Sequence, residues 1–285
     1  MLAVILAIVC ASAIGVVMKL AESRGVDRFH LLWANYVMAT GASAALWAAG
    51  DQPLRLAPLT VGLAVAGGLV FAGDFLLMFM AVKLRGMALP VILLRLSSVV
   101  TIGVSIAVFG EDPGMFQVVG ILAAFGAAVI LSAAVKGGAV QREGGRSLAW
   151  LVVSSLVLLW CFGMADLSLK LFERLGQPKE KPLFLTTLFF TALVVFTLIA
   201  LARRVPLRRT SVLWGLALGV PNMLVSFFVV TALAQLPSYV VLPLVSAGTV
   251  VLVSFIATLA FKEKVGGWGL VGLALTLAAI VAMNL

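Results

Sequence analysis

The feature that most constrains this chain is its division into apolar stretches that are each about as long as a bilayer is thick. About 20 consecutive apolar residues are enough for a helix that crosses the hydrocarbon core. Of the 285 residues, 63% are hydrophobic and only 11% are charged, whereas soluble proteins carry about 25% charged residues. We therefore predict an all-α integral membrane protein with ten transmembrane helices. The predicted spans are 2–20, 29–49, 59–83, 87–109, 115–135, 147–172, 183–202, 211–235, 238–260 and 267–285.

The basic residues that give the chain its net charge of +9 gather mainly at the ends of these spans and in the short segments between them. The connections after spans 1, 3, 5, 7 and 9 hold fourteen Lys and Arg residues, and the connections on the other side hold four. Basic loops tend to stay in the cytoplasm, so both termini are predicted to face outward from the cell inner membrane. The positive charge is thus explained by membrane topology and does not indicate a nucleic-acid partner.

A second constraint is an internal repeat. The segments Lys19–Gly25 and Lys170–Gly176 share Lys, Leu, Glu and Gly at an offset of 151 residues, and a second shared pattern follows near the end of each half at an offset of 152. Five spans per half is an odd number, so the second half must cross the membrane in the opposite direction. We predict two inverted five-helix repeats, 1–138 and 139–285. This architecture is typical of secondary transporters that work by alternating access.

Two opposite charges fall inside predicted spans, where an ionisable side chain is costly and suggests a functional site. Asp74 lies 11 residues before Arg85, and Arg95 lies 10 residues after it. At about 1.5 Å per residue both are roughly 15 Å deep, close to the bilayer midplane. Arg95 could bind an anionic group and Asp74 an amine or a coupling proton; alternatively, the two form a structural ion pair. The repeat offset places no charge at the equivalent positions, which include Ser226 and Ser246.

Other polar residues within the spans are further candidates. Asp166 lies four residues before Lys170 and can pair with it on one helix face, or it can serve in a proton relay. Lys19 and Lys170 are repeat equivalents and are either gate residues or ordinary basic helix ends. Pro221 is expected to kink its helix beside a cavity. The remaining candidates for substrate binding or coupling are Trp33, Asn35, Tyr36, Asn222 and Ser226.

No sequence motif points to catalysis or to a bound cofactor. The chain has no phosphate-binding loop, nucleophile triad or metal-ligand cluster, and Cys10 and Cys161 have no metal-site or redox spacing. His30 is expected at the membrane interface. We predict a non-enzyme without a cofactor or metal, with proton coupling left open. The expected partners are a small-molecule substrate and the lipid bilayer; the chain is either a monomer or a homodimer that packs through spans 5 and 10, where small residues allow close contact.

Each half ends its fourth span with Phe-x-Glu followed by spaced glycines. The motif residues are Phe109, Glu111, Gly114 and Gly120 in the first half and Phe261, Glu263, Gly266 and Gly272 in the second. With Lys19 at the end of the first span, this pattern resembles the EamA-type permeases of the drug/metabolite transporter superfamily over the full chain. The resemblance implies a carrier whose cavity is lined by spans 1–4 and 6–9, with spans 5 and 10 peripheral. It also implies a structural capping or hairpin role for Glu111 and Glu263.

Members of that family move amino acids, other metabolites, nucleotide sugars or drugs, and many are exporters. The charges of Asp74 and Arg95 favour a small polar substrate with an anionic or zwitterionic group, such as an amino acid. Two alternatives stay open. A hydrophobic-drug exporter would use Phe71, Phe75 and Phe79 on span 3. A lipid-carrier flippase, or a membrane subunit that transports nothing, also fits the composition.

Overall fold

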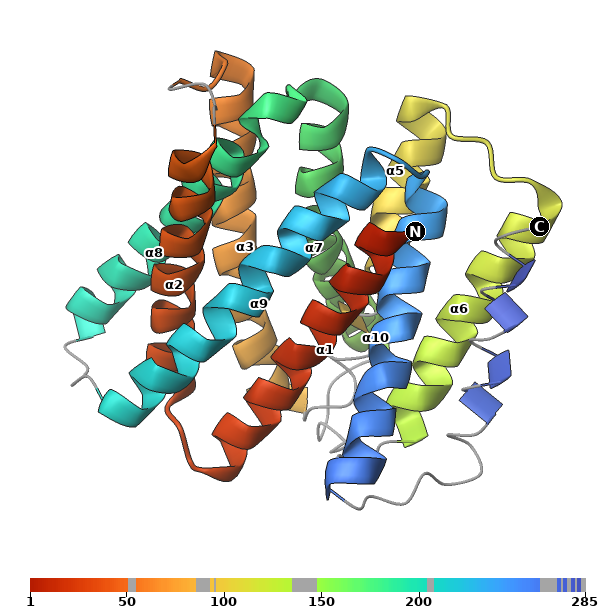
Figure 1. Cartoon of the computed structure of the whole chain (residues 1–285). Coiled ribbons are helices and arrows are strands. Elements are labelled where there is room, and N and C mark those ends of the chain that lie inside the picture. The colour runs from red at the N-terminus through yellow and green to blue at the C-terminus, as the bar shows by residue number, and fades with distance from the viewer. Residues whose placement is uncertain are drawn as a thin grey trace. The chain divides into compact units, whose positions relative to one another are not determined.

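The computed structural model of the chain is helical throughout the part that it describes, and no strand occurs there (Figure 1). The described residues are 1–50, 55–85, 93–94, 96–134, 148–203, 208–261, 271–272, 274–275, 278–279 and 281–282. The elements are α1 (Leu2–Ser23), α2 (Arg28–Ala49), α3 (Pro58–Arg85), α5 (Ser98–Phe109), α6 (Met115–Ala134), α7 (Leu148–Leu175), the 3-10 turn η1 (Pro178–Glu180), α8 (Lys181–Arg203), α9 (Arg209–Leu233) and α10 (Ser238–Phe261).

The helices have the length and composition of membrane spans. Among the described residues, five segments are long and apolar enough to cross a bilayer: Leu2–Ala21, Pro58–Leu77, Pro178–Ala202, Arg209–Leu233 and Ser238–Ile256. Large apolar side chains lie exposed on several helices, with Leu2 71% and Leu201 70% accessible. Such side chains are suited to contact lipid tails. The prediction of an all-α, multi-pass membrane protein is confirmed, while the tenth predicted span lies mostly outside the described residues.

The chain divides into two compact units. The first unit comprises Met1–Ala72 and Ser168–Ala234, and the second comprises Gly73–Leu167 and Gln235–Leu285. Each unit therefore combines segments from both halves of the sequence. The divisions fall inside α3 and α7, so these two helices each contribute to both units. The predicted repeat boundary at residue 138 lies outside the described residues.

In the first unit, α2 packs against α8 and α9, and α9 also packs against α1 (Figure 1). Two glycines of α9 permit a close approach to α2. A Cβ on Gly215 would collide with the backbone of Leu31, and one on Gly219 would lie 2.5 Å from the carbonyl oxygen of Asn35. Small residues let membrane helices approach until their backbones touch. Gly219, which lies beside Pro221, is thus required by packing.

A glycine also permits a close approach of two helices where α3 meets α8. A Cβ on Gly68 would collide with the carbonyl oxygen of Leu188. Gly68 and Gly219 are 151 residues apart, and Asn35 and Leu188 are 153 residues apart. The contact of α3 with α8 is therefore the counterpart of the contact of α9 with α2.

The starts of these helices also correspond. At the start of α3, the hydroxyl of Thr60 donates to Oε2 of Glu180 at 2.6 Å, and the backbone N–H of Ala57 donates to Oε1 at 2.8 Å. At the start of α9, the hydroxyl of Ser211 accepts from the backbone N–H of Asp27 at 3.1 Å. Thr60 and Ser211 are 151 residues apart, and Asp27 and Glu180 are 153 apart. Equivalent helices thus begin with polar contacts at equivalent positions.

In the second unit, α10 packs against α5 and α6. The carboxylate of Glu111, which follows α5, accepts from the backbone N–H of Ser238 at 2.9 Å and from its hydroxyl at 2.7 Å. Glu111 therefore caps the start of α10, as the predicted capping role requires. Its partner in the motif, Glu263, lies outside the described residues. A Cβ on Gly126 of α6 would lie 3.3 Å from Leu275, which places predicted spans 5 and 10 in contact within one chain.

Candidate functional site

A group of polar side chains from four helices meets in the second unit, and we name it the Asp74–Asp166 cluster. It comprises Asp74 of α3, Ser98 of α5, Asp166 of α7 and Ser246 of α10. The hydroxyl of Ser98 donates to Oδ2 of Asp166 at 3.3 Å and lies 3.4 Å from the hydroxyl of Ser246. The carboxyls of Asp74 and Asp166 are close enough to interact electrostatically. Two acidic groups and two hydroxyls from four helices therefore lie close together in the second unit.

The Asp74–Asp166 cluster lies far from the ends of its helices. Ser98 is the first of the 12 residues of α5, so it lies about 16 Å from the end of that helix at Phe109. Asp74 lies 11 residues before Arg85, the last described residue of α3, which corresponds to about 16 Å. The hydrocarbon core is about 30 Å thick. Both distances are consistent with a site near the middle of the membrane.

A one-residue interruption of the helix hydrogen bonding lies beside this cluster, although Ser97 itself keeps helical backbone angles (φ −60°, ψ −26°). Leu93, Leu94 and Leu96 are helical, Ser97 is in a turn, and α5 begins at Ser98. The hydroxyl of Ser97 donates to the carbonyl oxygen of Leu94 at 2.7 Å and does not cap α5.

Close packing of α7 on α5 fixes the position of Asp166. A Cβ on Gly163 would lie 2.6 Å from Cβ of Val100 and 2.7 Å from the carbonyl oxygen of Ser97. The hydroxyl of Thr101 donates to the carbonyl oxygen of Gly163 at 3.1 Å. Gly163 and Asp166 are three residues apart and so share a helix face. The same contact that brings α7 against the helix interruption therefore holds Asp166 beside Ser98.

Arg95, the predicted partner of Asp74, lies outside the described residues, and their ion pair stays a prediction. Lys170 is buried, and its ammonium lies 2.9 Å from a carboxylate oxygen of Glu173. The sequence offered Asp166 as the partner of Lys170, and it missed Glu173. Lys19, the other gate candidate, is half-buried near the end of α1.

Two of the predicted cavity residues in the first unit make contacts between helices. The indole N–H of Trp33 donates to the hydroxyl of Thr197 at 3.0 Å. The hydroxyl of Tyr36 donates to the carbonyl oxygen of Phe71 at 3.0 Å, and the whole residue is buried. These bonds join α2 to α8 and to α3, so in this conformation Trp33 and Tyr36 serve helix packing.

The side-chain amides of Asn35 and Asn222 in the first unit have fewer hydrogen-bond partners than Trp33 and Tyr36. Asn35 is fully buried, and neither its Nδ2 nor its Oδ1 has a hydrogen-bond partner among the described residues; the same holds for Nδ2 of Asn222. Ser226 bonds back to the carbonyl oxygen of Asn222 at 3.5 Å within α9. That helix runs unbroken through Pro221, so the proline causes at most a bend. Buried polar atoms without partners are unusual and often mark places for water or a ligand.

His30 is buried within the protein on the first turn of α2, and its expected place at the membrane interface stays a prediction. Its backbone N–H donates to Oδ1 of Asp27 at 3.0 Å, which caps α2, and its Nδ1 lies 2.8 Å from the same oxygen. Among the described residues, no group of three or more His, Cys, Asp or Glu side chains could hold a metal ion.

Comparison with known proteins agrees with this fold. The chain matches a solved crystal structure with a TM-score of 0.79 and 18% identity, over 99% of this chain and 98% of that one. It is 25% identical over 290 residues to an uncharacterized protein of Haemophilus influenzae, which covers 98% of this chain and 96% of the relative. The fold defines an α-helical multi-pass membrane protein. Residues 1–133 match the model of the EamA-like transporter family. This match over the first 133 residues supports the predicted place of the chain in the drug/metabolite transporter superfamily.

Proposed function

We propose that the protein is a secondary transporter that exports a small polar metabolite with an anionic or zwitterionic group, such as an amino acid, by alternating access. It would do so as ten transmembrane helices in two inverted five-helix repeats in the cell inner membrane, with both termini outside. The EamA-like match supports a membrane transporter.

The single observation that carries the proposal is the Asp74–Asp166 cluster. Two negative charges close together in a medium of low dielectric constant repel each other and lose hydration. A proton on one carboxyl, or a bound cationic group of the substrate, would relieve that repulsion. Ser98 and Ser246 supply hydroxyls that can donate to whichever carboxyl stays ionised. The cluster is therefore suited to bind a coupling proton or the amine of a zwitterion.

The internal correspondence of the first unit supports the inverted repeat. The contacts of α3 with α8 have counterparts in the contacts of α9 with α2, both at the close crossings and at the helix starts. Repeats that adopt matching arrangements can exchange two conformations of similar energy, as alternating access needs. The charged residues near the Asp74–Asp166 cluster do not follow this symmetry. The position that is equivalent to Arg95 in the second half holds the uncharged residue Ser246.

The test is transport by the purified full chain in proteoliposomes. A panel of labelled amino acids and other small anionic or zwitterionic metabolites would be measured with and without an imposed pH gradient. We expect at least one solute to move and the gradient to accelerate it. Asp74→Asn and Asp166→Asn should abolish coupled transport, while Asp112→Asn, an exposed loop carboxyl, should leave it unchanged.

Other outcomes would reject the proposal in different ways. Movement of apolar dyes alone would favour the hydrophobic-drug exporter. Phe71, which would serve that function, packs edge-on against Phe189 at 6.1 Å between ring centroids and so has a packing role. No movement of any soluble solute would favour the flippase or the non-transporting subunit. Wild-type rates in both Asp variants would remove the Asp74–Asp166 cluster from the mechanism.

A further inference from the structure

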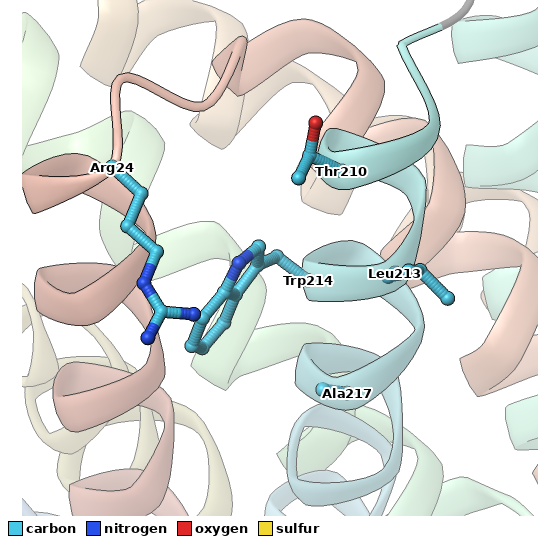
Figure 2. Close-up of a pocket in the computed structure, with 5 residues that line it drawn as sticks. All are labelled: Arg24, Thr210, Leu213, Trp214 and Ala217. Carbon is cyan, nitrogen blue, oxygen red and sulfur yellow. The ribbon is translucent and has the colours of Figure 1, made fainter.

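An open pocket of about 370 Å³ lies in the first unit between the end of α1 and the start of α9 (Figure 2). It is lined by Arg24, Thr210, Leu213, Trp214 and Ala217. Arg24 directly follows α1, and the other four residues lie on the first three turns of α9 at helical spacing. None of these five residues is among those proposed for transport.

The side chains of Arg24 and Trp214 point toward each other across this pocket (Figure 2). The guanidinium carbon of Arg24 lies 4.9 Å from the centroid of the Trp214 ring, within the range of a cation–π contact. This contact holds an exposed arginine in one place. Arg24 is exposed, and a guanidinium that contacts the face of a ring keeps the N–H donors of its edge, so these donors can bind an external anion.

The surface around this pocket changes from basic to apolar along α9. Arg208 and Arg209, at the start of the helix, are exposed. One turn further along, Leu213 is 60% exposed, and Ala217 is exposed on the turn after that. Trp residues in membrane proteins concentrate at the level of the lipid headgroups. This order matches a phospholipid, whose charged headgroup lies at the interface and whose acyl chains extend into the membrane.

We propose that this pocket binds an anionic phospholipid. The guanidinium of Arg24 contacts the headgroup phosphate, with the hydroxyl of Thr210 as a second donor, and an acyl chain lies along Leu213 and Ala217. Trp214 positions the guanidinium, and its indole ring lies at the depth of the headgroup. Basic pockets between membrane helices are suited to lipid phosphates, because charge attraction and apolar contact act on the same molecule. A free phosphate would use the guanidinium but would leave the apolar face uncovered.

The test uses the full chain in detergent, titrated with phosphatidylglycerol, phosphatidylcholine or inorganic phosphate, with the rise in unfolding temperature as the measure of binding. We expect phosphatidylglycerol to bind more tightly than phosphatidylcholine and inorganic phosphate to have little effect. Arg24→Gln should weaken phosphatidylglycerol binding about five-fold, the loss expected for one basic contact at a membrane surface. Trp214→Leu, which keeps the charge, should weaken it less.

Arg55→Gln is the matched control, because Arg55 is also an exposed arginine of the first unit but lies just before α3. It should bind phosphatidylglycerol as the wild type does. Equal binding by Arg24→Gln and the wild type would overturn the proposal, as would an equal loss in Arg55→Gln. A response to inorganic phosphate as large as that to phosphatidylglycerol would reject lipid as the occupant. The readout needs no transport, so its failure would leave the proposed function untouched.

Discussion

The hydroxyl of Ser98 donates to Oδ2 of Asp166 at 3.3 Å, and this bond ties the first residue of α5 to α7. Because α5 begins at Ser98, the position of the donor depends on where the preceding helix is interrupted. Gly163 lies against that interruption and places Asp166 within reach. The backbone at the start of α5 therefore determines where Ser98 can donate to Asp166. Small changes at this contact should affect transport as well as helix packing.

Ser98→Ala should reduce coupled transport about ten-fold, which corresponds to about 1.4 kcal/mol. Asp166 would lose a donor, and hydrogen bonds to charged groups contribute about 1.5–3 kcal/mol. The measurement is the initial rate of gradient-driven uptake at equal protein content. Ser105→Ala on the same helix is the control, because its buried hydroxyl has no partner among the described residues. Equal rates in the two variants would count against a role for the Ser98–Asp166 bond.

Gly163→Ala should destabilise the protein by about 1–3 kcal/mol, as overpacking of a close contact does. The added methyl would meet Val100 and the carbonyl oxygen of Ser97. Thermal unfolding of the purified chain in detergent measures the effect. Gly103→Ala is the control, because nothing lies within 4 Å of a Cβ at Gly103. If both variants unfold at the same temperature as the wild type, the result would contradict a close approach of α7 to α5.

The membrane spans could be predicted because each one depends on the summed hydropathy of about 20 residues. The predicted span 29–49 corresponds to α2, Arg28–Ala49, and the predicted span 238–260 begins where α10 begins, at Ser238. These boundaries agree within one residue, because polar or turn-forming residues follow the apolar runs directly. Contacts with other helices have little influence on this summed hydropathy.

The site could be predicted only in part. The cost of burying charge singled out Asp74 and Asp166, but serine is common in apolar helices, and nothing in its spacing marked Ser98. The four-residue spacing suggested Asp166 as a partner for Lys170, whereas the structure shows a pair with Glu173. The contact between Thr60 and Glu180 joins residues 120 apart in sequence, so only the packed helices reveal it.

Glu111→Ala should destabilise the protein by about 0.5–2 kcal/mol, the range for losing a helix cap. Two donors of Ser238, its backbone N–H and its hydroxyl, would lose their acceptor. Asp112→Ala, at the exposed neighbouring residue, should have little effect. The two variants would be compared by thermal unfolding. A larger loss in Asp112→Ala would show that the loop charge and not the cap provides the stability.

Gly68→Ala and Gly219→Ala should each destabilise the first unit by about 1–3 kcal/mol, because each added methyl meets the backbone of the facing helix. The two variants test the internal repeat, since the glycines are 151 residues apart and occupy corresponding crossings. Gly62→Ala on α3 is the control, because a Cβ there meets nothing within 4 Å. Thermal unfolding in detergent should show two similar losses and an unchanged control. A loss at Gly219 with none at Gly68 would mean that the two crossings are not equivalent, and it would count against the inverted repeat.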